Sequence, residues 1–325
     1  MKKTFLLLTL LWGALSAWAH DAEVDGIFYN LDAGNKTATV TYKGAKYDSY
    51  KDEYAGDVVI PKAVTYDGIT YSVTSLGVEC FMDCSSLTSI TIPNSVTSLG
   101  DYCLSGCSSL TSVTIPNSVT SLGNLCFYGS SGLTSIIIPN SVTSLGYACF
   151  YDCRSLTSIT IGNSVTSLGD ECFWGCSRLT SITIGNSVTS LGESCFYDCS
   201  SLTSITIPNS VTSLGDECFA ECSSLTSIYM LPSTPPSTGS SVFASTPLET
   251  VYVVSENTKT AYQAQYPWNQ YAIVVMPTGI EELQTDNTTP AIVGYYDLNG
   301  KLINGKQRGA VIVRYSDGTT RKVLK

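Results

Sequence analysis

The sequence predicts an elongated solenoid of stacked β coils, and three observations support this fold class. A unit of 23 residues is repeated seven times without a gap between residues 72 and 232. Each unit ends in alternating apolar residues, as a strand does when one of its faces is buried. A unit this short cannot bury its apolar side alone, so neighbouring units are expected to stack and share one core.

The fifth copy, residues 164–186, reads SVTSLGDECFWGCSRLTSITIGN, and positions within a repeat are counted from its first serine. The segment LTSITI at 179–184 predicts the strand. In ECFWGC at 171–176, the two cysteines and the phenylalanine fall on one side of a predicted short helical turn. Gly169 predicts a sharp turn before it.

An asparagine recurs at the end of the first six copies, where the strand turns into the next unit. Such a side chain can bond backbone groups of a neighbouring coil, so this column predicts a structural ladder. The column consists of Asn94, Asn117, Asn140, Asn163, Asn186 and Asn209.

The phrase LTSITIPNSVTSLGDECF at residues 202–219 resembles the repeat of the BspA-type leucine-rich repeat proteins of bacterial surfaces. The resemblance covers half of the chain in the repeats and, more loosely, both flanks. It implies a right-handed leucine-rich repeat solenoid, with parallel β coils and short helical turns. It also implies an exported, cell-surface protein that binds other macromolecules. One departure is the cysteine at position 9, where such repeats more often carry alanine.

The N-terminal part predicts export followed by a cap. Residues 1–19 have the pattern of a signal peptide, with two lysines, a short apolar run at 5–12 and an A-x-A cleavage site. The apolar run is too short to span a bilayer. Residues 20–71 predict a β cap over the first coil, built from alternating segments around the turns at 32–35 and 67–68.

The clearest variation between copies is an aromatic column at position 11. It runs Met82, Ser105, Tyr128, Tyr151, Trp174, Tyr197 and Ala220, and acidic residues gather beside it. Regularly spaced aromatic side chains would supply the large, rigid contact area of a binding surface. The alternative is that they lie flat over the core as lids. We expect a binding surface, if there is one, to use Tyr128, Tyr151, Trp174 and Tyr197.

A second candidate surface is the outward side of the strands, which is almost uniformly serine and threonine. Thr160 and Thr183 represent this column, whose hydroxyl groups could bond carbohydrate or ordered water. The alternative is that threonine serves strand propensity and solubility.

Most of the 13 cysteines occur as C-x-x-x-C in six of the seven copies, as in Cys172 and Cys176. Three states are open for them: buried thiols, disulfides and zinc thiolates. An i,i+4 pair on one helical turn is near the limit of disulfide geometry. Equivalent cysteines of adjacent coils are expected to lie farther apart. The interpretation as small, buried apolar residues is favoured, and neither a metal nor a cofactor is predicted.

After residue 227 the repeat frame decays. Residues 229–247 predict an irregular loop. Residues 233–276 predict a degenerate repeat and a C-terminal cap, with a helix at 258–265 and Trp268 as a plug for the open end. A polar linker is predicted at 277–290. Residues 291–325 predict a small β module with turns at Asn-Gly and Asp-Gly. Its phrases YYDLNGKL and VIVRYSDGTTRKVL resemble the sorting modules of proteins exported by the type IX secretion route.

Composition excludes several functions. Without Lys2 and Lys3 of the leader, the formal charge falls from −10 to −12, which argues against nucleic acid and anionic lipid as partners. His20 is the only histidine, so a Ser-His-Asp or Cys-His site cannot be assembled. No later segment is apolar enough to span a membrane.

These observations predict a non-catalytic protein of the cell surface or extracellular space. The expected function is that of an adhesin or interaction scaffold for an extracellular protein or glycan, from host matrix or other bacteria. The alternative is a structural surface-layer spacer without a dedicated binding site.

Overall fold

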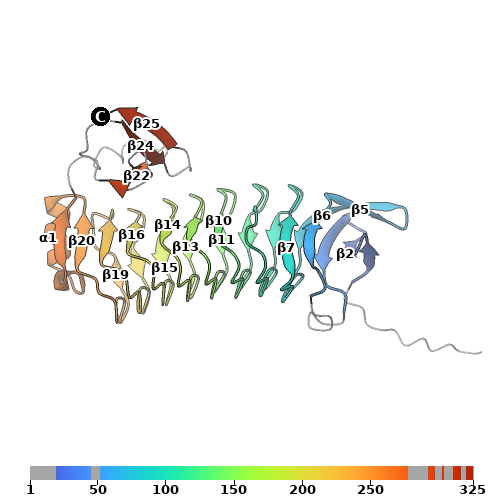
Figure 1. The fold of residues 1–325 in the computed structure, drawn as a ribbon, viewed down its shortest axis with the longest axis horizontal. Coiled ribbons are helices and arrows are strands. Elements are labelled where there is room, and N and C mark those ends of the chain that lie inside the picture. Colours follow the sequence, from blue (N-terminus) through green and yellow to red (C-terminus); the bar gives the residue numbers. More distant parts are fainter. Residues whose placement is uncertain are drawn as a thin grey trace, which may run out of the picture.

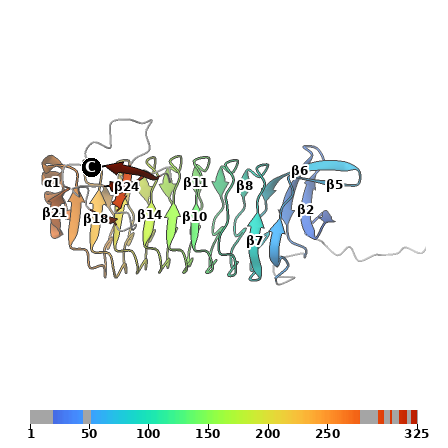
Figure 2. The same cartoon turned by 45° about the horizontal axis from the view of Figure 1, so that its top comes forward.

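The structure, a computed structural model, describes residues 20–44, 52–276, 292–296, 302–303, 310–315 and 320–324. The predicted signal peptide and the linker at 277–290 lie outside the described residues. The chain forms a β-solenoid of about 9 coils of about 23 residues, which confirms the predicted fold class (Figure 1). The coils stack like rungs along the long axis, and a β cap stands at the N-terminal end (Figure 2).

Most coils contribute one strand to a first row, which in the repeats comes from the LTSITI part, whereas the second copy makes only the isolated bridge from Ser112 to Ser135. The first row consists of β4 (Gly56–Val59), β7 (Leu87–Thr91), β10 (Ser135–Ile137), β12 (Ser158–Thr160), β14 (Ser181–Thr183), β16 (Ser204–Ile207), β18 (Ser227–Met230), β20 (Thr250–Val253) and β21 (Ala272–Val275). Its strands pair in parallel within the sheets β4-β7, β10-β12-β14 and β16-β18-β20-β21. Between β12 and β14 the pairing is in register, so that Ser158, Ile159 and Thr160 face Ser181, Ile182 and Thr183.

A second row of short strands comes from the Ser-Leu dipeptide at positions 4 and 5 of the repeats, and Ser237–Thr238 continues it in the coil after the seventh repeat. The leucine of each pair points into the core and is buried, as Leu168 is. The row consists of β6 (Ile69–Leu76), β8 (Ser98–Leu99), β9 (Ser121–Leu122), β11 (Ser144–Leu145), β13 (Ser167–Leu168), β15 (Ser190–Leu191), β17 (Ser213–Leu214) and β19 (Ser237–Thr238).

Glycine at position 6 lets adjacent coils approach after each short strand. A Cβ atom on Gly146 would lie 2.4 Å from the backbone nitrogen of Asn124, one coil earlier. The same atom on Gly169 would have 3.6 Å to its nearest neighbour, so this glycine is less constrained. The predicted sharp turn is therefore also a point of close backbone contact between coils.

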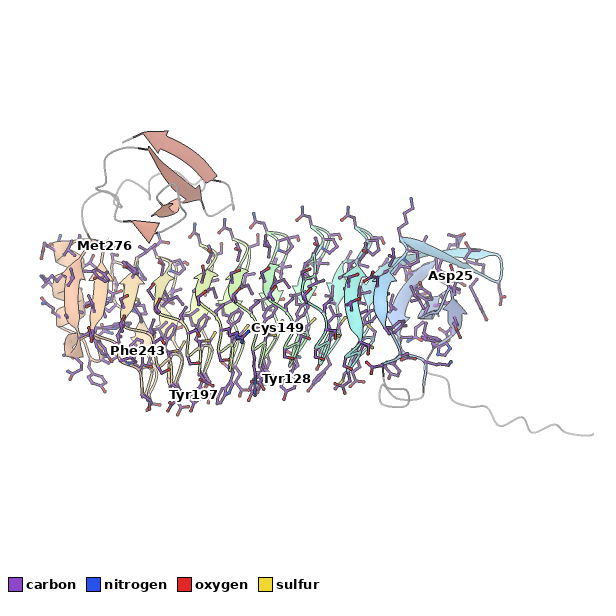
Figure 3. The ribbon with its side chains drawn as sticks, in the orientation of Figure 1. Asp25, Tyr128, Cys149, Tyr197, Phe243 and Met276 are labelled. Carbon is purple, nitrogen blue, oxygen red and sulfur yellow. The ribbon has the colours of Figure 1, made fainter. Side chains whose placement is uncertain are left out.

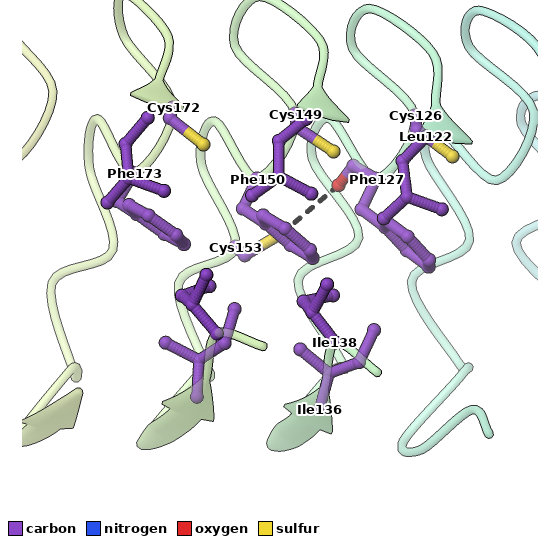
Figure 4. Close-up of a cluster of buried hydrophobic side chains, with 14 of the residues drawn as sticks. Leu122, Cys126, Phe127, Ile136, Ile138, Cys149, Phe150, Cys153, Cys172 and Phe173 are labelled. Atoms are coloured by element: carbon purple, nitrogen blue, oxygen red, sulfur yellow. Dashed lines mark hydrogen bonds between the residues drawn. The ribbon is translucent and has the colours of Figure 1, made fainter. Parts of the chain in front are cut away.

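The core is a column of phenylalanine rings at position 10, flanked by buried cysteine and aliphatic side chains (Figure 4). Phe127, Phe150 and Phe173 stack in parallel with centroids 5.1 and 5.5 Å apart. The column continues through Phe196 and Phe219 to Phe243, which belongs to the coil after the seventh repeat. Identical side chains in register thus build one continuous apolar interior.

The N-terminal cap continues the second row of strands. Strands β1 (Ala22–Val24), β2 (Ile27–Asp32) and β3 (Thr37–Thr41) pair antiparallel, and β3 then pairs in parallel with β6. Strand β5 (Ala63–Tyr66) forms an antiparallel hairpin with β6 around the predicted Asp67-Gly68 turn. The described part of the cap is therefore β structure that runs directly into the first coil, as the sequence predicts.

The segment at 229–247, predicted to be an irregular loop, instead forms a further coil. Strand β19 pairs with β17, and Leu214 faces Thr238, 24 residues later. Ser227 faces Thr250, 23 residues later, so the extra residue is removed again within the coil. The many prolines and serines obscured the repeat pattern, which the buried Phe243 and Val251 preserve.

The C-terminal end of the solenoid is closed by α1 (Glu256–Gln263) and the 3-10 helix η2 (Trp268–Gln270). Helix α1 begins two residues before the predicted start, because the Ser255 side chain caps it by accepting a bond from the Thr258 amide. Trp268 is fully buried and meets Phe243 edge to face, so it covers the last ring of the column.

Strands are also present in the C-terminal module. They are β22 (Ile292–Tyr296), β23 (Leu302–Ile303), β24 (Ala310–Tyr315) and β25 (Thr320–Leu324), in the antiparallel order β23-β22-β24-β25. All four lie within the small β module that the sequence predicts at 291–325.

Candidate interaction surface

Positions 7–12 of the repeats form one long side of the solenoid, here called the turn edge, which residues 170–175 represent in the fifth copy. The predicted helical turn is wrong for this segment. Glu171 and Gly175 have φ values of 55° and 69°, and positions 8 and 12 adopt the same left-handed conformation in every copy. A left-handed residue at every fourth position interrupts a helix, and the described repeats contain turns there instead.

The backbone of the turn edge bonds forward along the solenoid. The amides of Glu171, Phe173 and Gly175 donate to the carbonyls of Glu193, Cys195 and Tyr197 in the following coil, at 2.8 to 2.9 Å. At position 6, directly after the second row of strands, the direction is reversed, since the amide of Gly192 donates to the carbonyl of Leu168 in the preceding coil. Each inner coil is therefore bonded to both neighbours along its circumference.

The aromatic residues of position 11 form an outer ladder of rings on the turn edge. Ring centroids are 5.2 Å apart for Tyr128 and Tyr151, 5.7 Å for Tyr151 and Trp174, and 4.0 Å for Trp174 and Tyr197. The planes deviate by 25° or less. Figure 3 shows Tyr128 and Tyr197 along the same long side of the molecule. The structure thus brings the four predicted residues into one contiguous row.

The outer ladder faces solvent without being fully exposed. Tyr128 has 38% of its surface exposed, and Tyr151, Trp174 and Tyr197 are half-buried. Because the rings stack face to face, solvent meets the edges rather than the faces of the two inner rings, Tyr151 and Trp174. This geometry lies between the two predicted alternatives, since the rings cover the turn edge and still form part of its surface. Whether they bind a partner stays a prediction.

Acidic side chains border the outer ladder, and some of them have a structural role. At position 7, the Asp170 carboxylate accepts a bond from the Glu193 amide at 2.8 Å, and Asp101 holds the Asn124 amide in the same way. These carboxylates join adjacent coils, and Asp170 remains exposed while Asp101 is half-buried. The same arrangement confirms the predicted asparagine ladder at two steps, where Asn140 and Asn163 accept from the next coil.

One hydrogen bond links an exposed tyrosine of position 7 to an acid of the next coil. The Tyr147 hydroxyl donates to Oε2 of Glu171 at 2.6 Å. This bond to the carboxylate, together with burial, raises the pKa of Tyr147 to about 12. The turn edge therefore carries charge, phenol groups and ring edges in one strip.

The second predicted surface is also present. Thr160 and Thr183 lie side by side on β12 and β14 and are half-buried. The column is not uniform, because Ile137 occupies the equivalent place on β10 with 69% of its surface exposed. Other threonines serve coil stacking, as Thr157 and Thr180 do by donating to the carbonyl of the equivalent residue one coil earlier. A binding role for Thr160 and Thr183 stays a prediction.

All 13 cysteines are buried and free in the structure. Burial raises the pKa of the Cys172 thiol to about 12, and it raises the pKa of Cys176 as well. In the described part of the chain, no three His, Cys, Asp or Glu side chains gather so that they could hold a metal ion.

Position 13 explains why serine can replace cysteine in the third copy. The Cys153 thiol donates to the Phe127 carbonyl of the preceding coil at 3.1 Å, as Figure 4 shows. The Ser130 hydroxyl donates to the Leu104 carbonyl in the same way. A small donor, rather than sulfur itself, is what this position requires.

One expectation about the cysteines is wrong. The Sγ atoms of Cys80 and Cys103, equivalent residues of adjacent coils, are only 3.5 Å apart. Both occupy position 9, where coils pair through their backbone. The missing helix removes the separation that was expected between coils.

Sequence reasoning missed the left-handed columns that shape the turn edge. The signal was present, since position 12 is always glycine, aspartate or glutamate, as in Gly106, Asp152 and Gly175. Glycine and aspartate tolerate positive φ better than other residues.

Known proteins share this architecture. A model of the BspA type leucine-rich repeat region matches 6 copies over residues 63–176 and 143–266. A leucine-rich cell surface protein from Faecalibacterium prausnitzii A2-165 is 26% identical with a TM-score of 0.57, over 78% of this chain and 72% of that chain. The leucine-rich repeat protein of T. pallidum is 24% identical with a TM-score of 0.54, over 63% of this chain and 90% of that chain.

No curated protein matches the chain. Within the residues that the structure describes, no helix is long and apolar enough to cross a membrane. The family match spans well over half of the sequence, and the stacked coils agree with it. The chain therefore belongs to the BspA-type leucine-rich repeat family.

Proposed function

We propose that this protein is an exported, non-catalytic interaction scaffold of the cell surface, which binds an extracellular macromolecule through the outer ladder of the turn edge. The observation that carries the proposal is the unbroken row formed by Tyr128, Tyr151, Trp174 and Tyr197. The core does not require these rings, because Ser105 and Ala220 occupy position 11 in the neighbouring copies.

Surface location is supported by the leader sequence and by a relative. Residues 1–19 have the signal-peptide pattern, and the similar Faecalibacterium prausnitzii protein is described as a cell surface protein. We assign delivery to the module at 291–325. Removing this module should leave unfolding of the repeats unchanged while the protein fails to reach the cell surface. Normal display of the truncated protein would exclude this role.

Among extracellular partners, the geometry favours a protein over a glycan. Sugar rings bind aromatic side chains by lying on open ring faces, and stacking closes the inner faces of this ladder. Ring edges and phenol hydroxyls are suited to the mixed polar and apolar surface of a protein. The adhesin role follows if that protein belongs to host matrix or to another bacterium.

The test is a binding screen of the full secreted chain against extracellular-matrix proteins, mucins, glycans and bacterial surface proteins. The variant Tyr151→Ser with Trp174→Ser places at position 11 the residue that Ser105 already provides. The control is Tyr229→Thr, which removes a ring from the stacked pair Tyr229 and Tyr252 on the first row of strands. Thr206 occupies the equivalent place one coil earlier.

We expect the double variant to lose about 2 kcal/mol or more of binding free energy, and the control to bind normally. Equal binding by both variants and the unchanged protein would refute the assignment to the outer ladder. A screen without any partner would favour the spacer function.

A further inference from the structure

The charge of the repeats is confined to one side of the solenoid. Residues 72–232 contain 11 acidic and 2 basic residues. All acidic residues lie at positions 7, 8 and 12, on the turn edge, and the first row of strands carries no charge within the repeats. The acidic residues of the repeats are Glu79, Asp83, Asp101, Asp152, Asp170, Glu171, Glu193, Asp198, Asp216, Glu217 and Glu221. The two basic residues are Arg154, which pairs with Asp152 at 2.9 Å and also interacts with the charge of Asp198, and Arg178, so acidic residues outnumber basic ones 11 to 2.

The two ends of the outer ladder differ from its middle. Tyr151 and Trp174 have rings on both sides, whereas Tyr197 stacks, among the residues that the structure describes, only on Trp174. The following coil carries Ala220 at position 11, which is too small to cover the second face of the Tyr197 ring. Tyr128 is in the same situation at the other end, where the preceding coil carries Ser105.

The two open faces differ in the residues at positions 8 and 12 around them. Next to Tyr197 lie Asp198, at position 12 of the same coil, and Glu217 and Glu221, at positions 8 and 12 of the following coil. Burial raises the pKa of Tyr197, and the negative charges of these three residues raise it further. The same positions around Tyr128 hold Gly129, Tyr102 and Gly106. The chain therefore offers an aromatic face with carboxylates and a matched aromatic face without them at those positions.

We propose that the turn edge around Tyr197 is the docking site for basic side chains of an extended cationic polypeptide, with one ammonium or guanidinium group over the open face of Tyr197. A cation is attracted by the face of an aromatic ring and by nearby carboxylates. Nucleic acid and anionic lipid would be repelled by the same edge. This inference rests on the proposed function and specifies that its partner is a polypeptide with basic side chains.

A chain of basic residues fits this edge better than a metal ion does. The carboxylates are spread over successive coils, and the described residues contain no group that could hold a metal. Adjacent coils repeat at roughly 4.8 Å, so the negative charges extend along the axis as a strip. A polypeptide with several lysine or arginine residues can follow such a strip.

The experiment measures binding of a lysine oligomer to the full secreted chain by calorimetry, with a glutamate oligomer of equal length as the control. The first variant is Asp198→Asn with Glu217→Gln and Glu221→Gln, which keeps side-chain size. Two further variants, Tyr197→Ser and its matched control Tyr128→Ser, are compared for binding of the lysine oligomer. Each introduces serine at position 11, where the second copy already has Ser105. Circular dichroism confirms that each variant is folded.

We expect the lysine oligomer to bind and the glutamate oligomer not to bind. The triple variant should bind at least about tenfold more weakly, and Tyr197→Ser about threefold to thirtyfold more weakly, while Tyr128→Ser is unchanged. Binding should weaken steeply as ionic strength rises from about 0.05 M to about 0.5 M, because these charges are exposed to screening. Unchanged binding by the triple variant, or equal losses for the two tyrosine variants, would overturn the proposal.

The same variants separate this inference from the proposed function. If a natural partner loses affinity for the Tyr151 and Trp174 variant but not for the triple variant, the scaffold function stands and the cationic docking site is wrong. If neither variant changes binding of that partner, both assignments fail.

Discussion

Replacing Phe173 with alanine tests whether the inner column of rings, rather than the outer ladder, holds the coils together. Phe173 is fully buried and stacks on Phe150 at 5.5 Å and on Phe196 at 5.2 Å. Truncating a buried phenylalanine costs about 3–5 kcal/mol of unfolding free energy. Neighbouring coils fix the cavity walls, so the loss should fall in the upper half of this range.

The matched substitution on the outer ladder is Trp174→Ser. Trp174 also has two stacking neighbours, but it is half-buried. Losing two ring contacts at a partly solvated site should cost about 1–2 kcal/mol. A third variant, Phe173→Leu, should cost less than Phe173→Ala, because Leu104 occupies position 10 in the second copy.

The assay is equilibrium unfolding in guanidinium chloride, followed by circular dichroism and by tryptophan fluorescence. Repeat proteins can depart from two-state behaviour, so free energies are compared only where the two signals coincide. We expect Phe173→Ala to be the least stable variant and the unchanged protein to be the most stable. Phe173→Leu and Trp174→Ser should have intermediate stability. If Trp174→Ser destabilises as much as Phe173→Ala, the outer ladder is structural and the binding assignment loses its support.

Three further outcomes are expected. Gly146→Ala should lower the free energy of unfolding by about 1–3 kcal/mol, because its Cβ would lie 2.4 Å from the backbone of the preceding coil. Gly169→Ala, whose Cβ would have 3.6 Å to its nearest neighbour, should be within about 1 kcal/mol of the unchanged protein, and equal melting temperatures of the two variants would contradict the contact argument. Native protein should resist alkylation of its thiols because they are buried, and denaturation without reductant should then release 13 thiols; release of only one would show that the cysteines are paired as disulfides. The Tyr147 bond should stabilise the fold below pH 10.0, the ordinary phenol pKa, and this contribution should be lost as the pH rises through about 12; because Tyr147 is 44% exposed, it should stay below about 1 kcal/mol. The variant Tyr147→Phe should lack this contribution and show one fewer late-titrating phenol in ultraviolet absorbance, and an ordinary phenol titration in the unchanged protein would exclude the bond.

The repeat sequence was sufficient to predict the stacked coils, the strand at 179–184 and the buried frame. These features depend on apolar side chains at fixed spacing, which are visible in every copy. It was also sufficient to predict that Tyr128, Tyr151, Trp174 and Tyr197 lie in one row, because residues in equivalent positions of a solenoid lie in line.

The turn edge was harder to predict because its shape depends on backbone angles rather than on side-chain pattern. Cys172, Phe173 and Cys176 have helical spacing, yet left-handed residues at Glu171 and Gly175 prevent the helix. The same error placed Cys80 and Cys103 too far apart. Stacking between rings was also missed, because the sequence shows which residues align but not whether their faces or edges meet solvent.

The forward-bonding amides of the turn edge give the solenoid a polarity that extends to its two ends. A coil exposed at the C-terminal end would present unused amides along this edge, and a coil exposed at the N-terminal end would present unused carbonyls. Two such ends are complementary, so uncapped molecules would join head to tail into open filaments. The β cap before β6 and the closure by α1 and Trp268 stand at these two ends, so we expect them to limit such joining as well as to cover the core. Because the two ends differ chemically, neither cap could replace the other.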